Sequence, residues 1–283
     1  KLLSINTKEH IESLTSNERL RGVLAGNNIL YEGYTNKSPF YVHALILNSY
    51  IQSSYKIVGG GDTIGKLLVR KIKQLGGDVF RKKNVVSLET SNKRINHAIT
   101  ADAEIFYGQN FISNIHPKQT FKLIKDSLLR PAFINRINNL ENTVSVFVIN
   151  AILKPNTIPY TNQNYYYFDS YDVWSGPIYE TSQWPTAYAF YQTPNEMNQK
   201  YVRSISIMAY MRFEEVAPWA SSFKTTLEEN NRGESYENFK TQKAEKLIAC
   251  FRKNFPAVAD SIVEYYTSTP LTYRAYIGND DGS

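Results

Sequence analysis

Residues 55–80 read YKIVGGGDTIGKLLVRKIKQLGGDVF, and this stretch carries the clearest local pattern in the 283-residue chain. The apolar run at 55–58 predicts a short strand, three glycines follow it, and apolar residues at helical spacing then predict a helix over 62–75. A second glycine pair ends this helix before a second predicted strand at 79–88. The pattern therefore predicts a strand–helix–strand unit with glycines at both of its joints.

The positive charge of the chain is concentrated in the same region. There are 32 lysines and arginines against 26 aspartates and glutamates, which gives a formal net charge of +6. Residues 56–85 hold eight of the basic and two of the acidic residues, so this segment accounts for the whole excess. Such a distribution argues against nucleic-acid binding, which spreads basic residues widely. Lys66, Arg70 and Lys73 share one face of the predicted helix, which is typical of a solvated face; contact with an acidic membrane surface is the alternative.

Composition and motif content exclude several classes of protein. A single cysteine, Cys250, rules out a disulfide scaffold and a cysteine-based zinc site. The histidines are not spaced as metal ligands and no G-x-S-x-G is present, so we predict no metal site and identify no catalytic nucleophile, acid or base. The longest apolar runs, 41–47 and 144–149, are far shorter than the ~18 residues of a membrane span. No signal-peptide pattern is found, so we expect the protein in the cytoplasm, with a peripheral membrane location as the alternative.

The rest of the chain divides into a helical start and a second half that is rich in strands. Helical spacing predicts helices over 7–24 and 39–52. The other predicted elements are strands at 95–99, 104–112, 143–153, 164–168, 187–191 and 204–211 and helices at 117–128, 220–229, 234–255 and 258–266. We therefore expect an α+β fold, with an α/β piece followed by a mixed or antiparallel sheet with helices.

Aromatic residues are dense in part of the predicted sheet. Between 165 and 191 the tyrosines and tryptophans are Tyr165, Tyr166, Tyr167, Tyr171, Trp174, Tyr179, Trp184, Tyr188 and Tyr191. Aromatic walls with few charges are typical of a cavity for a long apolar or polyene ligand. The same residues alternate along predicted strands, where they would also form an ordinary packed sheet face. Both interpretations stay open.

The glycine joint Gly59-Gly60-Gly61 is the strongest candidate for a functional site. Where a strand leads into a helix, backbone amides and the helix dipole favour a bound phosphate. The spacing to Gly65 misses the dinucleotide fingerprint G-x-G-x-x-G by one residue, and Asp62 would repel a phosphate. A tight turn that needs the positive φ of glycine is the structural alternative.

Three stretches, in this order, resemble the FAD-dependent carotenoid desaturases and retinol saturases of the phytoene desaturase type. They are residues 55–85 with their two glycine groups, residues 111–120 with Ser-Asn before a helix, and residues 269–283, which open with Thr-Pro. The resemblance implies a fold similar to the substrate domain of amine-oxidase-like flavoenzymes. It also implies hydride transfer between FAD and an apolar, isoprenoid-like substrate, which is then desaturated or saturated.

The resemblance also implies which residues face the cofactor. The family's glycine turn, matched by Gly59, Gly60 and Gly61, lies beside FAD, and the valine matched by Val85 lies near its adenine half. The family's N-terminal G-x-G-x-x-G, which holds the pyrophosphate, and its C-terminal flavin segment have no match in these residues. We therefore interpret the chain as an interior fragment of such an enzyme, and we expect it to bind FAD weakly or not at all and to be inactive by itself.

On this resemblance the chain has four parts. They are a helical lead-in at 1–54, a partial FAD-domain piece at 55–130, the substrate-domain sheet and helices at 131–270, and a return to the FAD domain at 271–283. Two other hypotheses stay open. One is a non-enzymatic module of related architecture that binds a lipid or a prenylated protein. The other is an NADP-type Rossmann protein whose basic residues at 81–83 bind the 2′-phosphate.

Overall fold

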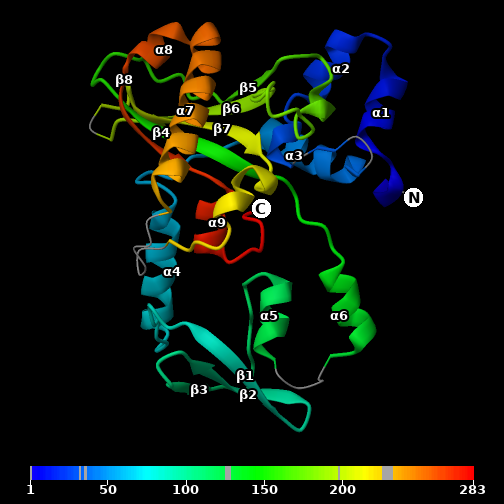
Figure 1. Cartoon of the computed structure of the whole chain (residues 1–283), viewed down its shortest axis with the longest axis vertical. Coiled ribbons are helices and arrows are strands. Elements are labelled where there is room, and N and C mark those ends of the chain that lie inside the picture. The colour runs from blue at the N-terminus through cyan, green and yellow to red at the C-terminus, as the bar shows by residue number, and fades with distance from the viewer. Residues whose placement is uncertain (1, 32, 35–36, 125–128, 197, 225–231) are drawn as a thin grey trace. The chain divides into compact units, whose positions relative to one another are not determined.

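A computed structural model describes most of the chain (Figure 1). The described residues are 2–31, 33–34, 37–124, 129–196, 198–224 and 232–283. They form two compact units. The large unit comprises residues 1–54, 143–276 and 280–283, and the small unit comprises 55–142 and 277–279. The helical lead-in thus belongs to the same unit as the predicted substrate-domain sheet.

The large unit is built on a five-stranded antiparallel sheet with the strand order β5–β6–β7–β4–β8. The strands are β4 (Ser145–Leu153), β5 (Tyr165–Phe168), β6 (Ala187–Pro194), β7 (Val202–Met211) and β8 (Ile262–Ser268). Alternate residues such as Phe147 and Ile149 of β4 are fully buried, because successive side chains of a strand point to opposite faces. The 21-residue helix α7 (Glu234–Asn254) contributes Leu247 and Phe251 to the same buried cluster (Figure 1). This helix and one sheet face therefore form the main core.

Three N-terminal helices also belong to the large unit: α1 (Thr7–Leu14), α2 (Glu18–Ala25) and α3 (Phe40–Gln52). The predicted helix 39–52 is confirmed as α3, whereas the single helix predicted over 7–24 is wrong. The chain divides it because the Asn17 side chain accepts a hydrogen bond from the Leu20 amide N–H at 3.1 Å and so begins a new helix. Short 3-10 turns lie at Leu2–Ser4, Asn28–Leu30, Val173–Ser175 and Phe213–Trp219.

The predicted helix 258–266 is wrong beyond residue 260. Helix α8 (Pro256–Asp260) ends there, and the chain enters β8, whose β-branched and aromatic residues pair with β4. Helix α9 (Pro270–Ile277) follows. The predicted helix 220–229 is wrong over residues 220–224, which form a turn and irregular structure, and its residues 225–229 lie outside the described residues. The predicted strands at 143–153, 164–168, 187–191 and 204–211 are confirmed as β4 to β7.

The small unit lacks the predicted strand–helix–strand arrangement. Helix α4 (Asp62–Gln74) is confirmed, but residues 55–57 have no regular secondary structure and residues 58–59 form a turn. The predicted strand 79–88 begins only at β1 (Val85–Ser91), which pairs with β2 (Arg94–Thr100); β2 in turn pairs with β3 (Ile105–Tyr107). A strand forms only where a neighbouring strand pairs with it through a ladder of hydrogen bonds. In the described part of the chain, residues 55–58 belong to neither sheet and pair with no strand.

The remaining helices of the small unit are α5 (Pro117–Leu123), which contacts β1, and α6 (Pro131–Asn138), which contacts α5. The predicted helix 117–128 is confirmed as far as residue 123, and residues 125–128 lie outside the described part. No residue of α4 is buried, so its apolar stripe, with Leu67 and Leu68 as members, is exposed. In the part of the chain that the structure describes, none of the helices combines the length and the apolar character that crossing a membrane requires.

Candidate functional site

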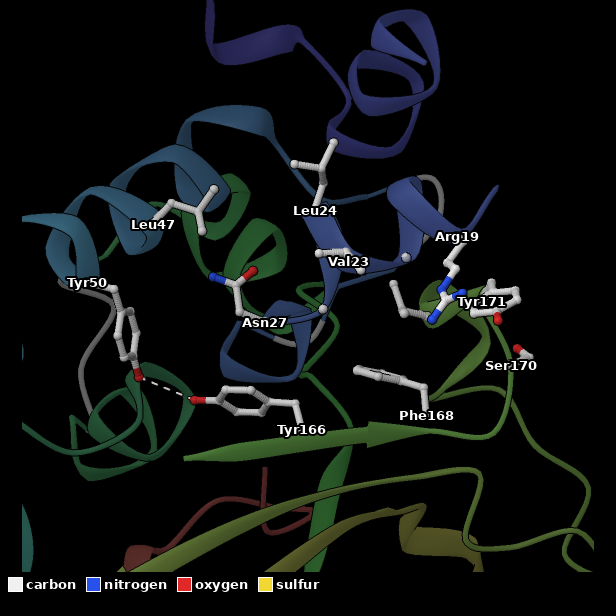
Figure 2. A pocket seen from close by; sticks show the side chains of 13 residues that line it. Arg19, Val23, Leu24, Asn27, Leu47, Tyr50, Tyr166, Phe168, Ser170 and Tyr171 are labelled. Carbon is white, nitrogen blue, oxygen red and sulfur yellow. Dashed lines mark hydrogen bonds between the residues drawn. The ribbon is translucent and has the colours of Figure 1, made fainter. Parts of the chain in front are cut away.

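An apolar pocket of about 530 Å³ opens in the large unit (Figure 2). Its walls come from α2, from α3 and from β5 with the loop that follows it. Its apolar lining includes Val23, Leu24, Leu47 and Phe168. This volume lies within the range of sites that hold a single small organic ligand. The pocket is therefore a candidate ligand site.

Local packing explains how the pocket forms. Gly22 of α2 lies so close to the loop after β5 that a Cβ at this position would sit 3.0 Å from the carbonyl oxygen of Tyr171. A glycine here therefore lets α2 approach the loop that closes one side of the pocket. On the same helix, Val23 is 72% exposed and Leu24 is 37% exposed, although both are apolar. Adjacent exposed apolar side chains that line a cavity are typical of a binding surface.

Polar groups stand at the two ends of the pocket. The hydroxyl groups of Tyr50 and Tyr166 are 3.4 Å apart at one end, and Figure 2 shows them pointing toward each other. Burial, and then the hydrogen bond to Tyr50, raises the pKa of Tyr166, so this phenol stays neutral and can donate. Arg19, Ser170 and Tyr171 lie at the other end. The pocket is therefore apolar in its middle and polar at its ends.

Asn27 carries an unpaired atom in the pocket wall. Its Oδ1 atom is buried and has no hydrogen-bond partner in the described structure. Most buried polar atoms in proteins are paired, and an unpaired one destabilises the fold. Each exception calls for an explanation, and a ligand that donates a hydrogen bond to this wall is one.

The structure divides the aromatic-rich segment between the pocket and the core. Tyr166 and Phe168 of β5 line the pocket, together with Tyr171 of the following loop. Tyr165 points to the other face of the same strand and stacks on Phe190, with their ring centroids 5.3 Å apart. The segment therefore lines a pocket on one face of the sheet and packs into the core on the other, and the ligand expected in the pocket stays a prediction.

The glycine turn has the conformation that needs glycine but not the charge that a phosphate needs. Gly59 and Gly60 have φ values of +84° and +87°, and Gly61 is the N-cap of α4. Asp62 follows within the first turn and forms an ion pair with Lys66 at 2.6 Å, which lowers the pKa of its carboxyl group. A carboxylate already occupies the positive end of this helix, so the turn fits an uncharged part of a dinucleotide better than its pyrophosphate.

Val85 opens β1 and pairs with Thr100 of β2. The predicted cofactor residues Gly59, Gly60 and Gly61 form the turn that leads into α4 instead, so Val85 lies on a different element from the three glycines. Their common role beside FAD stays a prediction. Among the described residues, His, Cys, Asp and Glu side chains do not gather in groups of three that could hold a metal ion.

Two curated proteins are similar to this chain, although no protein-family model matches it. Human all-trans-retinol 13,14-reductase is 25% identical over 299 residues, which cover 97% of this chain and 48% of that protein. The chloroplastic prolycopene isomerase of Daucus carota is 24% identical over 231 residues, which cover 80% of this chain and 35% of that protein. The chain is a distant homologue of both proteins. It spans about half the length of the first relative and about a third of the second.

Two solved structures share the fold. The PF1083 protein from Pyrococcus furiosus matches 94% of this chain and 58% of its own, with a TM-score of 0.61 and 14% identity. An oxidoreductase from Methanosarcina mazei matches 76% of this chain and 49% of its own, with a TM-score of 0.56 and 17% identity. At such low identity these likenesses concern the fold alone. They confirm the predicted α+β class, and the two homologues support the resemblance to carotenoid- and retinoid-related proteins seen in the sequence.

Sequence reasoning missed most of the pocket. Arg19, Leu47 and Tyr50 come from helices, and Asn27 from the turn after α2. All four precede β5 by more than a hundred residues, and no local motif marks them. Val23 and Leu24 follow Leu20 at i+3 and i+4, which is the spacing of an ordinary buried stripe, so nothing in the sequence marks these two side chains as pocket residues.

Proposed function

We propose that the chain is part of a flavin-dependent oxidoreductase that acts on a carotenoid-, retinoid- or other isoprenoid-like substrate. The observation that carries this proposal is the alignment with human all-trans-retinol 13,14-reductase over 97% of the chain. The α+β fold and the apolar pocket of the large unit support it, because an isoprenoid chain offers only apolar surface and double bonds for recognition.

In this proposal the pocket holds the isoprenoid chain. Val23, Leu24, Leu47 and Phe168 contact the apolar surface of the substrate and exclude water from it. Burial of that surface contributes about 25 cal/mol per Å², which is enough to bind a long hydrocarbon without polar anchors. The paired hydroxyl groups of Tyr50 and Tyr166 close one end of the pocket.

FAD, when bound, supplies hydride transfer to or from a carbon of the substrate. In the chain itself, Gly59, Gly60 and Gly61 provide a backbone surface without side chains that a flat or uncharged part of the cofactor can approach. Asp62 suits a hydroxyl donor rather than a phosphate. We therefore expect the 283-residue chain to bind FAD weakly, and a stoichiometric flavin absorbance band in the purified chain would contradict this expectation.

The first test of the proposal measures binding of all-trans-retinol through the change in retinol fluorescence. The purified chain should bind retinol saturably. Leu47→Trp, which fills the pocket, should abolish saturable binding. The matched control is Leu45→Trp on the same helix, because Leu45 is 64% exposed and does not line the pocket. Equal binding by the two variants would place the ligand elsewhere.

The second test is chemical. The protein expressed from its complete gene is reconstituted with FAD, which is left oxidised in one arm to accept hydride and is chemically reduced in the other arm to donate it. Each arm is incubated with retinol or a carotenoid, and the masses of the products are measured by mass spectrometry. We expect the gain or loss of two hydrogen atoms. Binding without any change in hydrogen content would refute the oxidoreductase proposal and favour a lipid-binding module instead.

A further inference from the structure

Arg19 is the charged residue among the 13 described residues that line the pocket. It lies in the first turn of α2 and its side chain is exposed. Figure 2 shows it at the same end of the pocket as Ser170 and Tyr171, whereas Tyr50 and Tyr166 stand at the opposite end. A ligand that fills the pocket lengthwise therefore meets a guanidinium group at one end only.

The acidic side chains of this region belong to a different cavity. Glu12, Glu18 and Asp172 line an adjoining, smaller cavity of about 220 Å³. Glu12 is paired there with Lys8 at 2.5 Å. Tyr171 lines both cavities and so forms part of the wall that they share. The lining of the apolar pocket itself thus contributes positive charge and no carboxylate.

We propose that this pocket binds a ligand with a long apolar chain and a single carboxylate head group. The chain lies against Val23, Leu47 and Phe168, and the carboxylate pairs with Arg19. The inference rests on the proposed function only in placing an apolar chain in this pocket. A guanidinium group presents a planar fork of donors that matches a carboxylate, so Arg19 selects for that head group.

Arg19 is exposed, so it and the apolar lining contribute differently to binding. An exposed ion pair contributes little because water screens it, whereas the apolar chain gains affinity for every part of its surface that it buries. Arg19 therefore decides between ligands that share a chain and differ in their head group. Two sources could provide such a ligand, an isoprenoid acid or a fatty acid, and the experiment includes one of each.

The test compares four probes on the intact chain: all-trans-retinoate, its methyl ester, palmitate and methyl palmitate. Each is titrated into the protein by calorimetry at low ionic strength. We expect the carboxylate to bind about fivefold more tightly than its methyl ester, which is the upper range for an exposed ion pair. Arg19→Gln should remove this preference and leave the affinity of the ester unchanged.

The matched control is Arg203→Gln. Arg203 is an exposed arginine of β7 outside the pocket lining, so this variant loses the same charge from the same unit. It should keep the preference for the carboxylate. Raising the salt concentration should weaken the preference in the parent protein, because the pair is exposed. Leu47→Trp should abolish binding of acid and ester alike, which locates both in the pocket.

The outcomes are distinct. An Arg19-dependent preference in the retinoate arm supports an isoprenoid acid, and the same preference in the palmitate arm alone supports a fatty acid. Equal affinity for acid and ester in both arms, or an equal loss in Arg19→Gln and Arg203→Gln, overturns the proposal. Retinol binding and the change in hydrogen content are measured separately, so the proposed function can stand when this proposal fails. If none of the four probes binds, the proposal is overturned as well.

Discussion

We expect Glu215→Leu to destabilise the large unit by about 3–5 kcal/mol, because it leaves a buried ammonium group unpaired. Lys243 of α7 forms an ion pair with Glu215 of the 3-10 turn Phe213–Trp219, and the two side chains are only 10% and 6% exposed. The Tyr179 hydroxyl donates to the other carboxylate oxygen at 2.5 Å. One carboxylate thus satisfies two buried donors from distant parts of the chain.

The structure also indicates where in this range the effect should fall. Without Glu215, the Lys243 ammonium keeps a cation–π contact with Trp184, 4.4 Å from the ring centroid. This contact offsets up to about 2 kcal/mol of the loss in a dry site. The Tyr179 hydroxyl still accepts a hydrogen bond from the Arg212 backbone N–H at 2.9 Å, but it loses its acceptor. We therefore expect about 3 kcal/mol, near the lower limit.

Urea unfolding, followed by tryptophan fluorescence, measures this loss. The double variant Glu215→Leu with Lys243→Met should be much more stable than either single variant, because it removes both charges and leaves apolar groups of similar volume. Glu214→Leu is the matched control. Glu214 lies in the same turn but is exposed, so its replacement should change the free energy of unfolding by less than about 0.5 kcal/mol.

Two results would refute this reasoning. One is a Glu215→Leu variant that unfolds within about 1 kcal/mol of the parent, which would mean that the carboxylate does not offset the burial of Lys243. The other is a double variant no more stable than the single ones, which would mean that packing rather than charge explains the loss.

Three further substitutions or conditions test other parts of the structure. Asn27→Leu should stabilise the chain by about 1 kcal/mol in urea unfolding without ligand, because it removes an unpaired buried oxygen. Burial raises the pKa of Tyr188 and Tyr191 from 10.0 to about 12. Between these pH values the folded state therefore retains phenol protons that the unfolded state loses. The free energy of unfolding should be highest below pH 10 and should fall as the pH rises toward 12. Gly282→Ala should cost about 2–4 kcal/mol in thermal unfolding, because φ is +71° and the new Cβ would lie 2.0 Å from the carbonyl oxygen of Pro270.

Each of these has its own control. A lower unfolding midpoint for Asn27→Leu would show that the amide is paired after all. Tyr188→Phe should make the alkaline loss smaller, and an unchanged pH profile would contradict the assignment. Gly278→Ala has a similar φ of +84° but nothing within 4 Å of the new Cβ, so it should cost only the backbone strain. Equal losses for Gly282→Ala and Gly278→Ala would exclude the clash with Pro270.

Much of the fold could be predicted from local sequence. The strands β4 to β7 lie close to their predicted bounds, because β-branched and aromatic residues recur there with the period of a strand. Helix α4 was predicted within one residue of its end, since a glycine with φ of +83° at position 76 stops it. The strand expected at 55–58 does not form because no partner strand lies beside it in the described structure. The helix expected over 258–266 gives way to β8 after residue 260 because β4 lies beside that segment and pairs with it.

Local patterns in the amino-acid sequence were thus enough to predict the α+β class, the alternation that builds the large sheet and the need for glycine at Gly59 and Gly60. The sequence also placed the chain near retinoid- and carotenoid-related proteins. Where a ligand fits depends instead on how distant elements pack together. The pocket brings Arg19, Asn27 and Leu47 against β5, and no local periodicity marks these residues, because a cavity arises where separate elements fail to fill the space between them. The same packing separated the tyrosines that line the pocket from those that fill the core.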